Sequence, residues 1–189
     1  MKKIVWEIEY FSLPPVIKYC KKCREKKAFI CSGQFRVNAQ RKSLDIWLIY
    51  KCSSCDTTWN ATLYSRISPQ SLNPELLEAF HRNDEMLIEQ FAMNADLLHK
   101  NGVEMGLPSY AIIGEDFSPT EAVTLEIKSK YFVHIKVSAI IREKLHLSQK
   151  DYLRLIDTGK IRSISDLDLH KCRLKNGITL VFNTDKSYC

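Results

Sequence analysis

Apolar and polar residues alternate along four segments of the N-terminal third of the chain, at residues 4–10, 29–37, 44–50 and 59–67. A period of two residues places every second side chain on the same side, which is typical of a strand with one buried face. The polar stretch at residues 38–42 predicts a hairpin turn between the second and third of these strands. We therefore expect an antiparallel β module over residues 1–70.

A helical period replaces this alternation in the middle of the chain. The tripeptide Asn-Pro-Glu at residues 73–75 is typical of a helix start, because asparagine caps free N–H groups and proline fits the first turn. Apolar residues then recur at steps of three and four as far as Leu98, and Asn101 and Gly102 end the run. We expect a helical segment over residues 71–102, with Asn83 as the candidate break between two helices.

The final part of the chain combines both periods. Glycine and proline residues mark residues 103–120 as a connection between domains. Beyond it, residues 121–189 contain two short helical stretches, the second starting at Ser148 and ending at Gly159, and three strand-like stretches at residues 123–128, 161–164 and 178–182. The expected fold class is α+β, with an N-terminal β module, a helical segment and a small C-terminal α+β domain.

Four cysteines form two C-x-x-C pairs with twenty-eight residues between them: Cys20, Cys23, Cys52 and Cys55. Two residues between ligands allow one tight turn to present both sulfurs to the same ion, and two such turns complete a tetrahedral zinc site. Four thiolates leave no position for a metal-bound water. We therefore expect a zinc-ribbon-like module with one structural Zn²⁺ ion, which replaces much of the core that a small sheet lacks.

Other roles for these cysteines stay open at this stage. Two disulfides would use the same four residues, and a redox-active pair would use two of them. The chain has seven cysteines and no signal-peptide pattern at its start, which favours a reducing compartment and a metal site. Cys31, Cys172 and Cys189 are treated as non-ligands, and Cys31 is the one of the three most able to join the site. Iron also binds four thiolates.

Composition places the chain among folded, soluble proteins. Of its 189 residues, 45% are hydrophobic and 26% charged, and its apolar runs are too short to cross a bilayer. The charge is uneven: residues 1–60 have 12 basic and 5 acidic residues, residues 61–118 have 3 and 9, and residues 119–189 have 13 and 8. Basic regions favour polyanionic partners, since neutralised phosphates release counterions. We expect a cytoplasmic protein without a membrane partner.

The stretch at residues 147–162, Leu-Ser-Gln-Lys-Asp-Tyr-Leu-Arg-Leu-Ile-Asp-Thr-Gly-Lys-Ile-Arg, resembles the alpha-L RNA-binding motif of a small-subunit ribosomal protein, tyrosyl-tRNA synthetases and pseudouridine synthases. The stretch Leu-Lys-Asn-Gly-Ile at residues 174–178 is similar to a later turn of the motif. The sequence differs at Gln149 and Tyr152, where the motif has arginine and alanine, at Ile164 and Ser165, where it has an Asn-Gly turn, and at Ile178, where aspartate is common. This resemblance covers residues 134–183 and implies a fold whose helices present basic side chains to structured RNA. The side chains in those positions are Lys136, Arg142, Lys144, Lys150, Arg154, Lys160 and Arg162.

The whole chain is also similar to a bacterial family of unknown function, DUF1062. The similarity extends from the paired cysteines through the strand at Trp59 to the acidic helices. It implies a bacterial cytoplasmic setting and this full-length architecture, but no activity.

Three hypotheses about function follow. The first is a zinc-stabilised protein that binds nucleic acid, most plausibly structured RNA such as rRNA or tRNA, with duplex DNA as a variant. Lys21 and Lys22 would then add a second basic surface, together with Lys18, Arg24, Lys26 and Lys27. Tyr19 and Trp59 could stack on a base, although Trp59 is better suited to packing beside the zinc site.

The second hypothesis is a protein adaptor, in which the ribbon and the acidic helices dock a partner. The third is an enzyme, for which the sequence offers five scattered histidines but no Ser/His/Asp pattern and no phosphate-binding glycine loop. We therefore expect a non-catalytic protein, and the sequence leaves its oligomeric state open.

Overall fold

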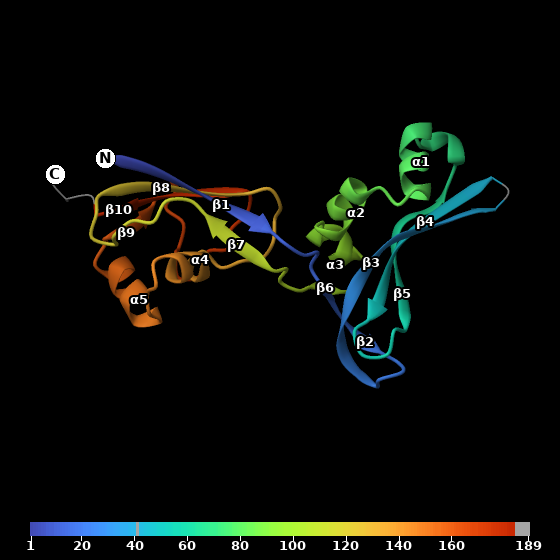
Figure 1. Ribbon diagram of the computed structural model, residues 1–189, viewed down its shortest axis with the longest axis horizontal. Coiled ribbons are helices and arrows are strands. Elements are labelled where there is room, and N and C mark those ends of the chain that lie inside the picture. Colours follow the sequence, from blue (N-terminus) through green and yellow to red (C-terminus); the bar gives the residue numbers. More distant parts are fainter. Residues whose placement is uncertain (41, 184–189) are drawn as a thin grey trace. The chain divides into compact units, whose positions relative to one another are not determined.

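The computed structural model describes residues 1–40 and 42–183, and the chain divides into two compact units. The inserted unit consists of Ser12–Ser109. The discontinuous unit combines Met1–Phe11 with the chain from Tyr110 onward. Figure 1 labels the helices and strands of both units. This division differs from the expected boundaries at residues 70, 102 and 120, because the first strand belongs with the C-terminal part.

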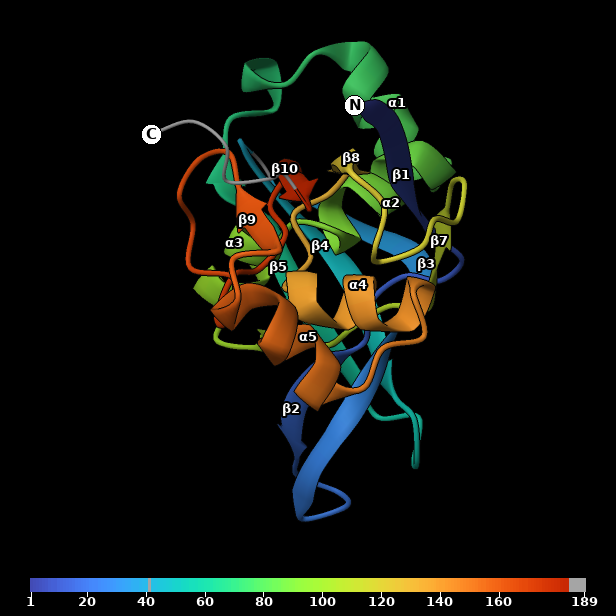
Figure 2. The same cartoon turned by 90° about the vertical axis from the view of Figure 1, so that its left-hand side faces the viewer.

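A five-stranded sheet forms the centre of the discontinuous unit, in the order β7-β1-β8-β10-β9. β1 runs parallel to β8, and the other neighbouring strands are antiparallel. Helices α4 (Val137–Lys144) and α5 (Gln149–Asp157) lie on the same side of this sheet (Figures 1 and 2). The strands are β1 (Lys2–Tyr10), β7 (Tyr110–Ile113), β8 (Val123–Ser129), β9 (Ile161–Ser163) and β10 (Gly177–Phe182).

The apolar positions of β1 explain its place in this sheet. Ile4, Trp6 and Ile8 are buried, and the Trp6 indole N–H donates a hydrogen bond to the Glu115 carbonyl at 2.9 Å. The Trp6 ring also packs against Phe117, with centroids 5.6 Å apart. The strand predicted at residues 4–10 is therefore confirmed, but its partners are β7 and β8 rather than a strand of the cysteine-containing module.

The ends of α5 follow the predicted signals. The Ser148 hydroxyl accepts a hydrogen bond from the Asp151 N–H at 3.1 Å, and Gly159 has a left-handed φ of 70° just after the helix. Tyr152 is fully buried and its hydroxyl donates to the Leu169 carbonyl at 3.0 Å. Gln149 accepts a hydrogen bond from the Arg142 guanidinium at 2.8 Å. Gln149 and Tyr152, two of the positions that differ from the alpha-L motif, thus have structural roles.

A second five-stranded sheet forms the inserted unit, in the order β5-β4-β3-β2-β6, with all neighbours antiparallel. The predicted hairpin is formed by β3 and β4, and Arg41 of its predicted turn lies outside the described residues. Gly33, with a φ of 70°, lies at the bulge between Cys31 and Phe35. The strands are β2 (Val16–Cys20), β3 (Glu25–Gln40), β4 (Ser43–Cys52), β5 (Thr58–Ile67) and β6 (Glu104–Met105).

Three helices follow β5, where the period predicted one segment with a single possible break. The break at Asn83 is present, and a second one occurs at residues 93–94. Asn83 has a φ of 56°, and its side chain accepts a hydrogen bond from the Phe35 N–H at 2.7 Å. Asparagine tolerates this backbone conformation better than most residues. The helices are α1 (Pro74–His81), α2 (Glu85–Ala92) and α3 (Ala95–Lys100), after a 3₁₀ turn at Pro69–Ser71.

An aromatic cluster holds α1 and α2 against the sheet. Phe80 of α1 meets Phe35 of β3 edge-on at 4.8 Å between ring centroids, and Phe91 and Tyr64 complete the cluster. This cluster covers the sheet face around Phe35, beyond the bulge of β3. The cysteines lie at the other half of the same face, around Phe29.

The segment predicted as a connection contributes to both sheets. β6 pairs with β2 in the inserted unit, and β7 pairs with β1 in the discontinuous unit. Residues 103–120 are therefore not a plain linker. Among the helices of the described residues, none has the length and apolar character that crossing a bilayer requires.

Replacing Trp6 with alanine tests the assignment of β1. The substitution removes a fully buried indole, so we expect the discontinuous unit to lose about 3–5 kcal/mol of stability. Hydrogen exchange measured by mass spectrometry should show reduced protection of β8 and β10 with little change in β3 and β4. Phe11→Ala, at a side chain that is 67% exposed, is the control. Loss of protection in β3 and β4 instead would contradict the assignment.

Candidate metal centre

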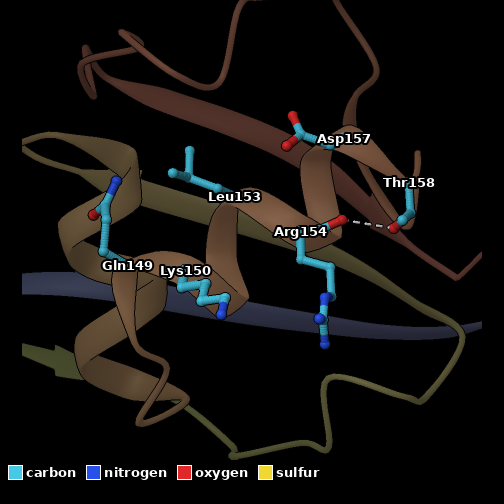
Figure 3. A pocket seen from close by; sticks show the side chains of 6 residues that line it. All are labelled: Gln149, Lys150, Leu153, Arg154, Asp157 and Thr158. Atoms are coloured by element: carbon cyan, nitrogen blue, oxygen red, sulfur yellow. Dashed lines mark hydrogen bonds between the residues drawn. The ribbon is translucent and has the colours of Figure 1, made fainter.

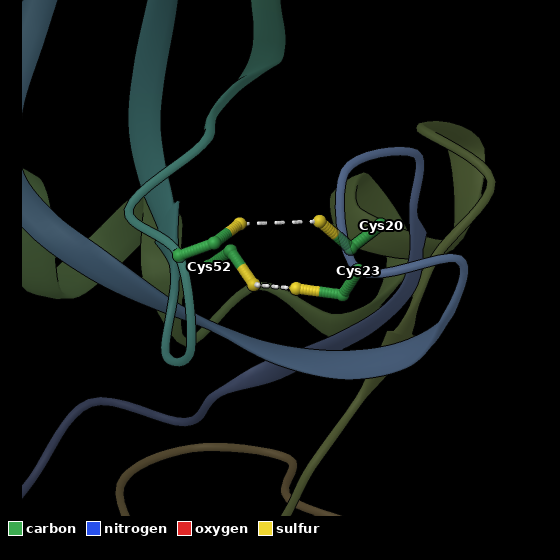
Figure 4. A group of neighbouring side chains, drawn as sticks. Cys20, Cys23 and Cys52 are labelled. Atoms are coloured by element: carbon green, nitrogen blue, oxygen red, sulfur yellow. Dashed lines mark hydrogen bonds between the residues drawn. The ribbon is translucent and has the colours of Figure 1, made fainter.

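The two C-x-x-C pairs meet at one end of the second sheet. The sulfurs of Cys20, Cys23, Cys52 and Cys55 all lie within 4.8 Å of one another. The Cys20 and Cys55 sulfurs are 3.5 Å apart, and those of Cys23 and Cys52 are 3.9 Å apart (Figure 4). A tetrahedron with metal–sulfur bonds of about 2.3 Å has sulfur–sulfur edges of about 3.8 Å. The four cysteines are therefore close enough to hold one metal ion.

Both pairs use the same backbone turn. The Arg24 N–H donates to the Cys20 carbonyl at 2.8 Å, and the Asp56 N–H donates to the Cys52 carbonyl at 3.0 Å. Arg24 and Asp56 have φ values of 59° and 56°, so each pair is followed by one left-handed residue. This turn reverses the chain and brings the second sulfur of each pair beside the first.

Strand pairing positions the two turns opposite each other. Cys20 ends β2 and Cys52 ends β4, and both strands flank β3. Phe29 of β3 pairs with Val16 on one side and with Cys52 on the other. Cys20 and Cys52 are each 1% exposed, whereas Cys23 and Cys55 are half-buried. Cys20 and Cys52 are thus shielded by the protein, whereas Cys23 and Cys55 are partly accessible to solvent.

The neighbours of the sulfurs affect their protonation in opposite ways. Hydrogen bonding to Cys55 and the closeness of the other sulfurs raise the pKa of Cys23. The Thr57 hydroxyl, 3.1 Å from the Cys55 sulfur, lowers the pKa of Cys55, and the Thr57 backbone N–H adds to this effect. Four crowded sulfurs cannot all be thiolates without a compensating positive charge. A metal ion held by the four sulfurs would supply that charge.

Sequence reasoning missed Thr57. Its signal is a hydroxyl residue two positions after the second cysteine of a pair, which is within reach of the sulfur in this turn. The Thr57 carbonyl also accepts a hydrogen bond from the Cys52 N–H at 2.9 Å. One residue therefore supports both ligands of its pair.

Among the described residues, Cys31 and Cys172 are not members of the cluster. Cys31 of β3 pairs with Tyr50 of β4, and burial raises the pKa of the Cys31 thiol. Cys172 belongs to the discontinuous unit, and Cys189 lies outside the described residues. The cysteines in the described part of the chain are free thiols rather than disulfides.

The aromatic residues beside the cysteines point to different sides of the sheet. Trp59 packs against the buried Tyr50 ring at 5.5 Å, and the Lys18 ammonium lies 5.2 Å from the Trp59 ring centre. Tyr19 is 55% exposed. Trp59 therefore has the packing role, and Tyr19 is the accessible one. Lys21 and Lys22 are exposed in the turn between the two cysteines of their pair.

The seven basic residues implied by the alpha-L resemblance differ in their exposure and in their contacts. Lys150 and Arg154 of α5 line a shallow pocket with Gln149, Leu153, Asp157 and Thr158 (Figure 3). Lys136 and Lys160 are exposed. Lys144 forms an ion pair with Asp116 at 2.8 Å, and Arg142 is half-buried against Gln149.

Arg162 lies on a different side of its sheet from the buried core. Its neighbours in β9, Ile161 and Ser163, are buried, and alternation along the strand directs Arg162 the opposite way. Lys150 and Arg154 are therefore the pair that α5 presents together.

Replacing Cys52 with serine should abolish metal binding. We expect the metal content to fall from one ion per chain to none, because the loss of one thiolate opens the shell, and a structural ion contributes on the order of 10 kcal/mol to folding. Elemental analysis measures the metal, and hydrogen exchange should show β2, β3 and β4 unprotected while β8 and β10 stay protected. Cys31→Ser is the matched control. A Cys52→Ser protein that kept its metal would show that Cys52 is no ligand.

Replacing Thr57 with valine should weaken metal binding about 10- to 100-fold. Without the donated hydrogen bond the pKa of Cys55 rises, so protons compete with the metal at higher pH than in the unaltered protein. Titration with a coloured chelator over a pH series measures both effects. Thr58→Val, at the next and exposed position, should leave affinity and release pH unchanged. Equal behaviour of the two variants would exclude the role of Thr57.

Comparison with known proteins adds a family but no activity. No curated protein matches the chain, and no solved structure matches it. A family model described as a protein of unknown function, DUF1062, matches residues 37–167. The match includes Cys52 and Cys55 and the helices α1 to α5, and it begins after Cys20 and Cys23. Because it spans more than half of the 189 residues, the chain belongs to the DUF1062 family.

Proposed function

We propose that this protein is a non-catalytic nucleic-acid-binding protein whose inserted unit is held together by a structural zinc ion, and that its ligand is structured RNA. The observation that carries the proposal is the four-sulfur cluster, because exposed lysines lie within its turn. In this proposal the zinc ion stabilises the inserted unit, and the exposed lysines contact the phosphates of the RNA.

The donor set supports zinc. Four sulfurs at tetrahedral spacing are soft ligands that suit Zn²⁺, and the buried Cys20 and Cys52 leave the metal no open position toward the protein. The ion would act by linking the two turns. Catalysis at the metal would need a free coordination position, which four thiolates do not leave.

Unpaired cations support a polyanionic ligand. Lys21 and Lys22 near the metal and Lys150 and Arg154 on α5 are exposed and form no ion pair within the described residues. Such side chains are available to phosphate oxygens, and each contact releases counterions. In the discontinuous unit, α4 and α5 precede the antiparallel pair β9 and β10, which is consistent with the resemblance to the alpha-L motif.

A protein adaptor is the second candidate. Met86 in α2 is 77% exposed, and it lies among the acidic residues of the helical segment. An exposed methionine on an acidic surface suits a partner with apolar and basic side chains. Under this function the basic residues serve solubility only.

Removing the two cations of α5 tests RNA binding. We expect the Lys150→Ala, Arg154→Ala variant to lose crosslinking to a defined RNA class in bacterial cells. In vitro its affinity should fall and the slope of log affinity against log salt should shrink by about 0.9 per lost phosphate contact with a duplex. Sequencing of the crosslinked nucleic acid identifies the ligand.

A variant with Lys100→Ala and Lys175→Ala is the control, since it removes the same charge from other exposed positions. It should retain the RNA crosslink. Equal loss in both variants would indicate a non-specific charge effect. Absence of RNA enrichment with the unaltered protein would contradict RNA binding and favour the adaptor.

A further inference from the structure

The sheet of the inserted unit has two different faces. One face carries Cys20, Phe29, Tyr50 and Cys52, and beyond the bulge it is covered by the aromatic cluster of α1 and α2. Alternation along the strands directs the residues between these positions to the other side, which we call the outer face. The outer face includes Ile17, Tyr19, Lys26, Ala28, Ile30, Arg36, Trp47, Ile49 and Lys51.

Three cross-strand pairs on the outer face have the same composition. Tyr19 of β2 pairs with Lys26 of β3, Ile30 of β3 pairs with Lys51 of β4, and Arg36 of β3 pairs with Trp47 of β4. Each pair joins one cation to one aromatic or aliphatic side chain. Along β3 the cation alternates between its own strand and a neighbouring strand, so cations and apolar groups are interleaved across the face.

The apolar members are accessible to a ligand. Tyr19 is 55% exposed and Ile30 is 48% exposed, although both lie within a sheet. Trp47 is half-buried, and the Arg36 guanidinium carbon lies 5.9 Å from its ring centre. A planar guanidinium over an indole adds a second flat surface to the ring. Exposed aromatic side chains on a sheet suit stacking with nucleic-acid bases.

The charges of this region favour an anion. Lys26, Arg36 and Lys51 form no ion pair within the described residues, and Lys21, Lys22 and Arg24 of the adjoining turn are also exposed. Two carboxylates border the face. Asp45 accepts a hydrogen bond from the Arg66 N–H at 2.8 Å, and Glu104 lies in β6 opposite Ile17. The cations therefore outnumber the acids, most clearly at the end near Tyr19.

We infer that the outer face binds single-stranded RNA, with bases stacked on Tyr19 and on the Trp47 and Arg36 pair and with phosphates at Lys26 and Lys51. This inference rests on the proposed function and assigns it a second surface with a different class of ligand from α5. A duplex hides its base faces, whereas an unpaired strand exposes them to stacking. With about 3.3 Å per residue, Lys26 and Ile30 are about 13 Å apart, so the face accommodates several nucleotides.

Fluorescence anisotropy of the full-length protein tests this inference. The probes are a labelled oligouridylate of about twelve nucleotides, within the site sizes of single-strand binders, and an RNA duplex of matched length. We expect Tyr19→Leu to weaken oligouridylate binding roughly ten- to hundredfold and Tyr19→Phe to retain it, because only the second keeps a ring to stack. Lys26→Gln with Lys51→Gln should reduce the salt slope by about 1.4.

Matched variants separate this surface from others. Phe11→Ala removes an exposed ring, and Lys100→Gln with Lys175→Gln removes two exposed charges away from the outer face. Both should bind the oligouridylate as the unaltered protein does. Metal content and thermal unfolding of each variant confirm that the inserted unit is folded.

The remaining outcomes distinguish the two proposals. If the unaltered protein binds neither probe, the proposed function fails and the inference fails with it. If it binds RNA and only the Lys150→Ala, Arg154→Ala variant loses affinity, the inference alone is overturned. If the outer-face variants bind RNA normally but lose a co-purifying protein, the face is a protein-docking surface and the inference is wrong.

Discussion

The inserted unit depends on bringing four cysteine sulfurs within 4.8 Å of one another. Thiolates at such distances repel, and the neighbouring sulfurs already raise the pKa of Cys23. A bound cation would remove this repulsion and would link the turn after β2 to the turn after β4. These turns lie on either side of β3, so one ion at this position would connect three strands. Among the described residues, Phe29 and Tyr50 are large buried side chains near the cysteines.

The same sheet face is stabilised by different means at its two ends. Around Phe35 the rings of Phe80, Phe91 and Tyr64 form an ordinary aromatic core beneath α1 and α2. Around Phe29 the cysteine cluster takes the place of helices. The bulge at residues 31–35 separates the two regions and keeps Phe29 and Phe35 on the same face. Both means act on one face, and among the described residues the outer face contributes none of the buried hydrophobic side chains.

The insertion of one unit into the other follows from local strand pairing. Tyr10 pairs with Tyr110, and the Ser109 N–H donates to the Ser12 hydroxyl at 2.9 Å. The chain therefore leaves and re-enters the first sheet at adjacent positions, as it would through a long hairpin loop. The parallel partner of β1 is β8, which lies more than a hundred residues later in the chain. The hydrogen bonds on that side of β1 therefore form only once β8 is in place.

The sequence predicted most elements but not this arrangement. A period of two residues at residues 4–10 identifies a strand with a buried face, and it says nothing about which strands lie beside it. Ile4, Trp6 and Ile8 would satisfy the pattern in either sheet. The starts of α1 and α5 were predictable because capping is local, whereas the break after α2 was missed although Asn94 caps α3 by accepting a hydrogen bond from the Leu97 N–H at 3.0 Å. The sequence therefore predicted where many strands and helices begin and end, but it did not predict which of them lie side by side.

The same limit holds for the candidate site. Local spacing along the sequence was informative, whereas the positions of residues in the fold were not predictable from it. Cysteine spacing alone identified the four candidate ligands, because C-x-x-C geometry is local. The basic residues were chosen from a linear motif, and the structure separates Arg162 from Lys150 and Arg154 by strand alternation. Thr57 escaped notice because its contact depends on the turn that follows Cys55.

Successive side chains of a strand point to opposite faces of the sheet, so the direction of a candidate ligand such as Cys20 determines which neighbouring aromatic residue is accessible. Cys20 must face the metal, so Tyr19, one residue earlier in β2, must face the other way. Trp59 pairs with Tyr50, which lies two residues before Cys52 and shares its face. Once the direction of one cysteine side chain is known, the directions of the other side chains in its strand follow. By this reasoning Lys26 and Lys51, which are paired with outer-face residues, lie with Tyr19 on the outer face, whereas Lys18 lies with Trp59 on the metal side.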